Sequence, residues 1–131
     1  GDVYKRQVMG FKEYFSNDFT TSDDAKHEEL VTRYYRNDYQ TVKAVIIDVA
    51  KNLGYEVEDV NDQYKEILLT SPKSEIIVSI IQLQFYEMAV DFKITTHYLI
   101  SRARGIKEIA ELYHRFNGRL NLKAKGNKNN A

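Results

Sequence analysis

The sequence predicts an α+β fold, a two-layer sandwich in which an antiparallel sheet of about five strands carries two main helices on one face. Two segments repeat apolar residues at spacings of three and four, which is typical of helices with one buried face. The region between them alternates with a period of two and contains short turns, which favours strands paired antiparallel. The 131 residues, 43% of them hydrophobic, are enough for one core. The predicted order is β-α-β-β-β-β-α.

The first predicted strand covers residues 30–36, which are rich in β-branched and aromatic side chains. A helix follows over about residues 38–53, with Asn37 as the expected N-cap and Gln40 placed as in a capping box. Gly54 suits the left-handed position after the last helical turn. The apolar stripe of this helix consists of Val42, Val45, Ile46, Val49, Ala50 and Leu53.

Four more strands are expected after this helix, at residues 55–60, 64–71, 76–83 and 90–95. The last of them alternates apolar with polar residues, which predicts one buried face and one face in water. The strand at 76–83 has apolar residues on both faces, so we expect it to be central and covered on both sides. One parity of this strand holds Ile76, Val78 and Ile80, and the other holds Ile77, Ile81 and Leu83.

A second helix is predicted over residues 105–117, opened by Gly105 and ended by Gly118. Residues 30–120 therefore form the predicted single domain, and residues 121–131 form a basic, flexible tail without apolar periodicity. The stripe of this helix consists of Ile106, Ile109, Ala110, Tyr113 and Phe116.

The amino-terminal region divides into two parts. Residues 1–8 look like translated adapter sequence, so we expect them to be a non-native leader and the natural chain to begin at Met9. Residues 9–29 form an aromatic lead-in that begins as a short predicted helix. Its large side chains predict either cover for the domain or an interaction segment, made of Phe11, Tyr14, Phe15 and Phe19.

Four features between about Leu30 and Leu120 resemble small bacterial domains of unknown function that are described only as cytosolic proteins. These features are the Arg33-Tyr34-Tyr35 succession, the helix end at residues 52–57, the Val90-Asp91-Phe92 strand and the terminal helix. The resemblance implies a shared architecture and no particular activity. A polar segment often follows the Val-Asp strand in such domains, and residues 93–97 replace it here.

Several function classes lack their sequence signals. The chain has no cysteine, so a disulfide scaffold, a thiolate metal site and cysteine catalysis are excluded. His27, His97 and His114 lie far apart and outside metal-binding motifs, and we expect neither a metal nor a cofactor. We find no nucleophile elbow or phosphate-binding loop. No apolar run reaches the length of a membrane span, and the expected location is cytoplasmic.

Basic residues gather near the carboxyl end, where residues 101–131 hold eight basic and two acidic side chains. If Gly105 opens the second helix, the helix amides and nearby arginines suit an anion such as a phosphate. This candidate anion site consists of Ser101, Arg102, Arg104, Gly105 and Lys107. A nucleic-acid surface is the extension of this idea and adds Arg115, Arg119, Lys123 and Lys125.

The best prediction for function is a small non-catalytic domain that binds another protein or assembles with itself. Unpaired strand edges and the aromatic lead-in are the expected contact surfaces. Anion or nucleic-acid binding through residues 101–128 is the main alternative. Ten tyrosines and six phenylalanines allow a third interpretation, a carrier with an apolar ligand between sheet and helices, although ordinary close packing explains them equally well.

Overall fold

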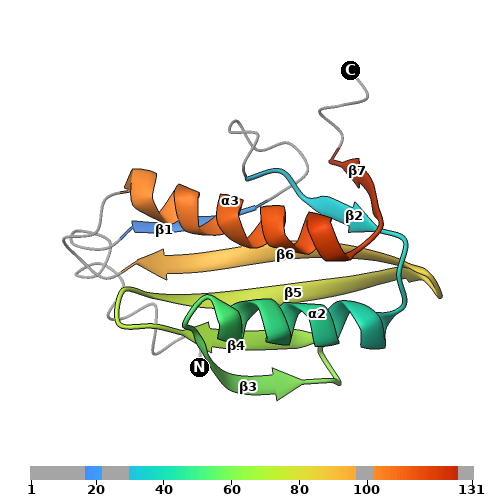
Figure 1. Ribbon diagram of the computed structural model, residues 1–131, viewed down its shortest axis with the longest axis horizontal. Coiled ribbons are helices and arrows are strands. Elements are labelled where there is room, and N and C mark those ends of the chain that lie inside the picture. The colour runs from blue at the N-terminus through green and yellow to red at the C-terminus, as the bar shows by residue number, and fades with distance from the viewer. Residues whose placement is uncertain (1–16, 22–29, 97–101, 127–131) are drawn as a thin grey trace.

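A computed structural model of the protein describes residues 17–21, 30–96 and 102–126. Two helices and seven strands occupy this part of the chain (Figure 1). In chain order they are β1 (Asn17–Thr20), β2 (Arg33–Tyr35), α2 (Tyr39–Asn52), β3 (Glu56–Asn61), β4 (Glu66–Thr70), β5 (Ser74–Gln84), β6 (Glu87–Thr96), α3 (Arg102–Arg119) and β7 (Leu122–Lys125).

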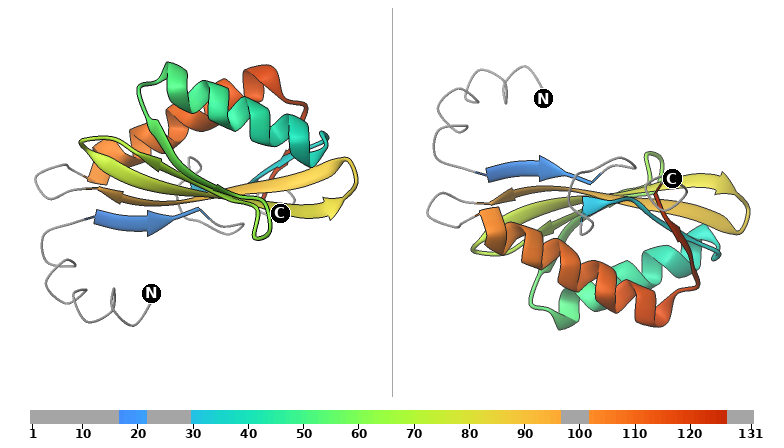
Figure 2. Two further views of the ribbon diagram at one scale, coloured as in Figure 1. Left: turned by 90° about the horizontal axis from the view of Figure 1, so that it is seen from below. Right: turned by 90° about the horizontal axis from the view of Figure 1, so that it is seen from above.

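The strands form one antiparallel sheet in the order β3-β4-β5-β6-β2-β7. β1 also pairs with β6, on the edge that β2 uses: Thr20 lies opposite Lys93 and Arg33 lies opposite Val90. Both helices lie on the same face of this sheet (Figure 2). The predicted two-layer α+β architecture is therefore confirmed, and β5 is a central strand as expected.

Helix α2 matches its predicted stripe but begins with a different cap. Asp38, not Asn37, is the N-cap, and its carboxylate accepts a hydrogen bond from the Thr41 amide at 3.3 Å. The Asn37 side chain instead accepts the amide of Asn121 at 2.8 Å, because the strand that follows α3 passes beside it. The helix ends as predicted, with Gly54 at a φ of +93°.

Helix α3 is longer than predicted at both ends. It begins at Arg102, so Gly105 lies buried inside the helix and does not open it. Gly118 does not end the helix, which continues to Arg119; a glycine inside a helix costs only about 1 kcal/mol, which tertiary packing can offset. Leu112 is a buried member of its apolar face that the predicted stripe omitted, and Leu120, directly after the helix, is buried as well.

Two strands were not predicted. Asn17–Thr20 lies in the lead-in, where a short helix was expected, and is strand β1. Leu122–Lys125 lies in the segment expected to be a tail and pairs with β2. Each has four residues, too few for a periodic pattern, and each is stabilised by backbone pairing with a neighbouring strand, which depends little on its own side chains.

The space between the sheet and the helices is filled by side chains from both layers. Phe92 on β6 packs edge-to-face on Tyr113 at 4.6 Å between ring centroids and stacks on Phe116 at 5.8 Å. The buried residues of β6 have the predicted parity, and those of β5 belong to one of the two parities that were expected to be covered. They include Ile76, Val78, Ile80, Val90, Phe92 and Ile94.

Candidate functional site

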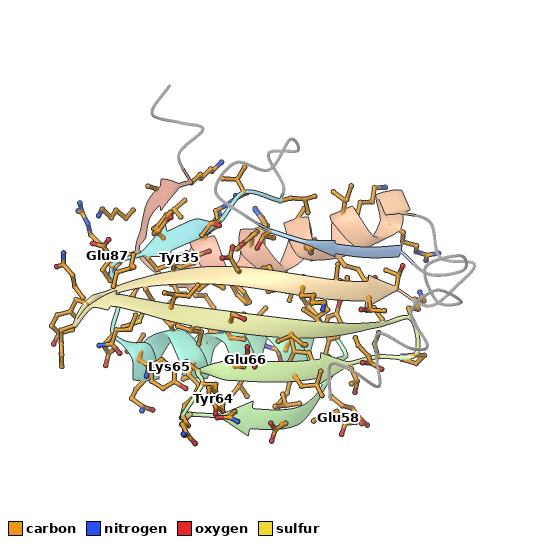
Figure 3. All side chains as sticks on the ribbon, turned by 180° about the vertical axis from the view of Figure 1, so that it is seen from behind. Tyr35, Glu58, Tyr64, Lys65, Glu66 and Glu87 are labelled. Carbon is orange, nitrogen blue, oxygen red and sulfur yellow. The ribbon has the colours of Figure 1, made fainter. Side chains whose placement is uncertain are left out.

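The face of the sheet that points away from the helices carries exposed apolar side chains, and Figure 3 views the molecule from this side. We expected both faces of β5 to be covered, and this part of the prediction is wrong. Ile77 is half-buried and Ile81 is exposed, whereas their neighbours on the helix side are buried. We call this side, which neither of the described helices covers, the open face.

Four large apolar side chains are exposed where β5 and β6 meet. They are 43%, 49%, 68% and 64% exposed and belong to Ile81, Leu83, Phe85 and Tyr86 respectively, which together we call the hairpin patch. The rings of Phe85 and Tyr86 pack edge-to-face with centroids 4.7 Å apart. A cluster of this kind, in contrast to a single exposed leucine, is typical of contact surfaces.

The position of the two aromatic residues is unusual for a hairpin. Gln84 lies opposite Glu87, so Phe85 and Tyr86 form the whole turn. Two-residue turns favour glycine, asparagine and aspartate, for conformational reasons and because turns face water. Neither turn propensity nor core packing accounts for two exposed rings here. The expected contact surfaces were the strand edges and the aromatic lead-in. Two adjacent aromatic residues between two predicted strands could have indicated this surface from the sequence.

A depression of about 270 Å³ adjoins the hairpin patch on the open face. We call it the Asp91 depression, because among the described residues that line it Asp91 alone is charged at neutral pH. Thr21 and Thr32 supply further polar groups. Its other lining residues are Tyr34, Ile81, Leu83 and Ala89.

Two threonines fix the Asp91 carboxylate. The hydroxyls of Thr21 and Thr32 both donate to Asp91 Oδ1, each at 2.6 Å. Thr21 Oγ1 also accepts the Phe92 amide at 2.8 Å. Thr21 directly follows β1 and Thr32 directly precedes β2, so Asp91 links β1 to β2 beside β6. The alternation predicted for residues 90–95 puts Asp91 on the polar face of its strand, but no pattern in the sequence indicates either threonine.

A buried arginine lies on the helix side of β2. Arg33 is 5% exposed, and its guanidinium lies 4.5 Å from the centroid of the Tyr113 ring, in cation–π geometry. Its Nη1 also donates to the carbonyl of Val31. Tyr113 donates its hydroxyl to the Val90 carbonyl at 2.7 Å, and burial raises the pKa of this tyrosine well above its usual value. This polar group therefore lies in the core beneath α3.

The predicted anion site is only partly assembled. Arg104 and Lys107 line a depression of about 290 Å³, but Glu108 and Glu111 line it too. Ser101 lies outside the described residues, and Gly105 is inside the helix and not at its amino end. The local charge is thus mixed, which is less favourable for an anion than the basic loop the sequence suggested.

Glu108 is the centre of a hydrogen-bond network in that depression. Its Oε1 accepts the hydroxyl of Tyr55 at 2.5 Å and that of the buried Ser74 at 2.8 Å. Burial and then the hydrogen bond to Glu108 raise the pKa of Tyr55. The network joins α3 to the start of β5 and to the residue before β3, so its evident role is to hold the layers together.

Three of the four residues predicted for nucleic-acid binding pair with acidic side chains. Arg115 pairs with Glu111 at 2.7 Å, one turn earlier on α3. Arg119 pairs with Asp48 of α2. In the same way Lys123 pairs with Glu87 at 2.9 Å, and Lys125 on β7 is half-buried. These pairs reduce the positive field that a phosphate backbone would meet.

The structure bears on several other predictions only in part. Phe11, Tyr14 and Phe15 lie outside the described residues, whereas Phe19 is in β1, opposite Ile94. In the described ranges, no group of three or more histidines, aspartates and glutamates could hold a metal ion. Nor is any helix within these ranges both long and apolar enough to cross a membrane.

No family model and no curated protein matches the chain. The resemblance to small bacterial cytosolic domains therefore stays a prediction.

Proposed function

We propose that this protein is a small non-catalytic module that binds another polypeptide through the open face of its sheet. The hairpin patch carries this proposal, since Ile81, Leu83, Phe85 and Tyr86 are exposed together next to an uncovered sheet face. Complete burial of one such side chain stabilises a complex by about 1.5 to 3 kcal/mol, before the costs of association. The proposal keeps the predicted interaction role and moves its surface from the lead-in to the hairpin.

The strand edges are less suitable than the open face. Edge strand β3 presents the exposed acidic residues Glu56, Glu58 and Asp59. The opposite edge is the four-residue strand β7, which carries Lys123 and Lys125. Charged side chains and short strands are features that prevent edge-to-edge pairing. We therefore favour contact by side chains of the open face over the addition of a strand.

Site-specific photo-crosslinking in the native cell tests the proposal. A benzoyl-phenylalanine at position 86 is expected to give an adduct of one discrete mass. The same probe at position 51, on the exposed side of α2, is the matched control and is expected to give none. Replacing Phe85 by serine in the position-86 variant should weaken the adduct strongly. Absence of a position-86 adduct would contradict the proposal.

The mass of the adduct also identifies the class of partner. An adduct of twice the chain mass of 15.3 kDa would show self-assembly, and sedimentation equilibrium of the purified protein should then detect a dimer. Any other mass indicates a different polypeptide.

A further inference from the structure

The Asp91 depression holds a carboxylate whose position is fixed before any ligand arrives. Both threonine hydroxyls that bind Oδ1 belong to buried residues, Thr21 and Thr32. The amide of Phe92 in turn fixes the Thr21 hydroxyl. A carboxylate held in this way loses little conformational freedom when it binds a ligand. Among the described residues no donor is placed on its second oxygen, Oδ2, and Asp91 itself is only half-buried.

In residues 17–21, 30–96 and 102–126, no cation pairs with the Asp91 carboxylate. Among the ion pairs of the described residues, none within 4 Å involves Asp91. Lys93 is the nearest cation on its own strand, two residues along the same face, which is about 7 Å away by strand geometry. Lys93 does not line the depression. Within the part of the chain that the structure describes, the depression is therefore a site of negative charge without a cation inside it.

The walls restrict which cation fits. Ile81, Leu83 and Ala89 present apolar surface, and Tyr34 adds an aromatic side chain. A metal ion would need more oxygen ligands than one carboxylate. A neutral apolar group would cover the Asp91 charge without compensating it, which is costly. A ligand must cover the apolar walls and also compensate the charge of Asp91. A long side chain that ends in a positive charge does both, because its alkyl stem contacts the walls while its head reaches the carboxylate.

We infer that the Asp91 depression receives a lysine or arginine side chain of the bound polypeptide. This inference rests on the proposed function and adds to it, since Ile81 and Leu83 belong both to the depression and to the hairpin patch. The partner thus presents a basic side chain beside apolar ones. Its basic residue would lie over β6, and its apolar residues would contact the hairpin.

A titration followed by amide chemical shifts tests the inference on the full chain. The probe is a capped valine–lysine–valine tripeptide, and the matched control has norleucine, which keeps the stem but lacks the ammonium. We expect saturable shifts at Thr32, Ile81 and the amides of residues 89–92. The norleucine peptide should bind at least about fivefold more weakly, as expected for loss of a charge-assisted hydrogen bond. Equal affinity of the two peptides would overturn the inference.

Three variants complete the test. Asp91→Asn keeps an oxygen for the threonine hydroxyls but removes the charge, and should weaken the lysine peptide about tenfold. Asp59→Asn removes the same charge from edge strand β3 and should leave affinity unchanged. Leu83→Lys places a competing cation at an exposed position and should also weaken binding about tenfold. This variant tests the cation site even if Asp91→Asn does not fold. Unchanged binding in Leu83→Lys and in folded Asp91→Asn would overturn the inference.

The inference and the proposed function fail in different ways. Discrimination between the two peptides without any position-86 crosslink would refute the polypeptide interface and leave a cation site. A position-86 crosslink with no such discrimination would refute the cation site alone.

Discussion

Ionisation of two buried tyrosines should limit the stability of the folded protein at high pH. Tyr113 donates to the Val90 carbonyl, and Tyr35 donates to Asn117 Oδ1 at 2.7 Å. Burial is the largest cause of the raised pKa of each, ahead of opposing charge from Arg33. In the unfolded chain the same hydroxyls ionise near 10.0. A folded-state pKa above the unfolded value means that stability is complete below pH 10 and falls as the pH rises further.

We therefore predict a steeper loss of stability above pH 10 in the wild type than in Tyr113→Phe. At about pH 11 the two slopes should differ by roughly 1.4 kcal/mol per pH unit, because unfolding then releases one proton more from the wild type. Urea unfolding at pH values from 8 to 11, in steps of about one unit, measures the free energy of unfolding and hence both slopes. Tyr35→Phe is expected to act in the same direction. If Tyr113→Phe loses stability with pH as steeply as the wild type, Tyr113 does not ionise on unfolding and the prediction is wrong.

Two glycines at the level of the helices have opposite roles. Gly54 ends α2 at a φ of +93°, a backbone conformation that residues with a Cβ rarely adopt. Gly118 lies inside α3 with helical geometry. An added Cβ would meet no atom within 4 Å at either position. Backbone conformation, and not packing, therefore determines the difference in stability between the two alanine variants.

We predict that Gly54→Ala destabilises the protein by about 1 to 2 kcal/mol, the cost of a left-handed residue. Gly118→Ala should stabilise it by about 0.5 to 1 kcal/mol, since alanine is the better helix former. Urea midpoints of the two variants and the wild type decide the matter. Changes of the same sign in both variants would refute the assigned conformations.

The elements show which parts of the fold were predictable. Helix α2 and strand β6 are long and periodic, so their sequence patterns located them well. The ends of α3 were misplaced because Gly105 and Gly118 are tolerated inside a well-packed helix. Strands β1 and β7 were missed because their pairing partners, and not their own periodicity, determine them.

The candidate site was less predictable than the fold for a similar reason. Thr21 and Thr32 meet at Asp91 only because β1 and β2 lie along the same edge of β6. Sequence separations of 70 and 59 residues conceal this contact. The uncovered face of β5 was equally hidden, since its apolar pattern is the same for a covered strand and for a contact surface.

At the level of the whole molecule, β7 closes the sheet beside β2. The Arg36 amide donates to the Asn121 carbonyl at 2.8 Å, and the Asn121 amide donates to Asn37. Lys123 adds an ion pair with Glu87 on β6. β2 itself has only three residues, and one of them is the buried Arg33. Without β7 this short strand would become the edge of the sheet.

Truncation after Leu120 is therefore predicted to destabilise the protein by about 2 to 4 kcal/mol, since several hydrogen bonds of about 1 kcal/mol each are lost. Truncation after Gly126 keeps β7 and should change stability by less than about 0.5 kcal/mol. Urea unfolding of the two truncated chains and the full chain measures the difference. Equal stability of all three chains would mean that residues 121–126 behave as the flexible tail predicted from their sequence. A loss confined to the shorter chain would show that pairing with β2 overrides the weak strand preference of a lysine-rich segment.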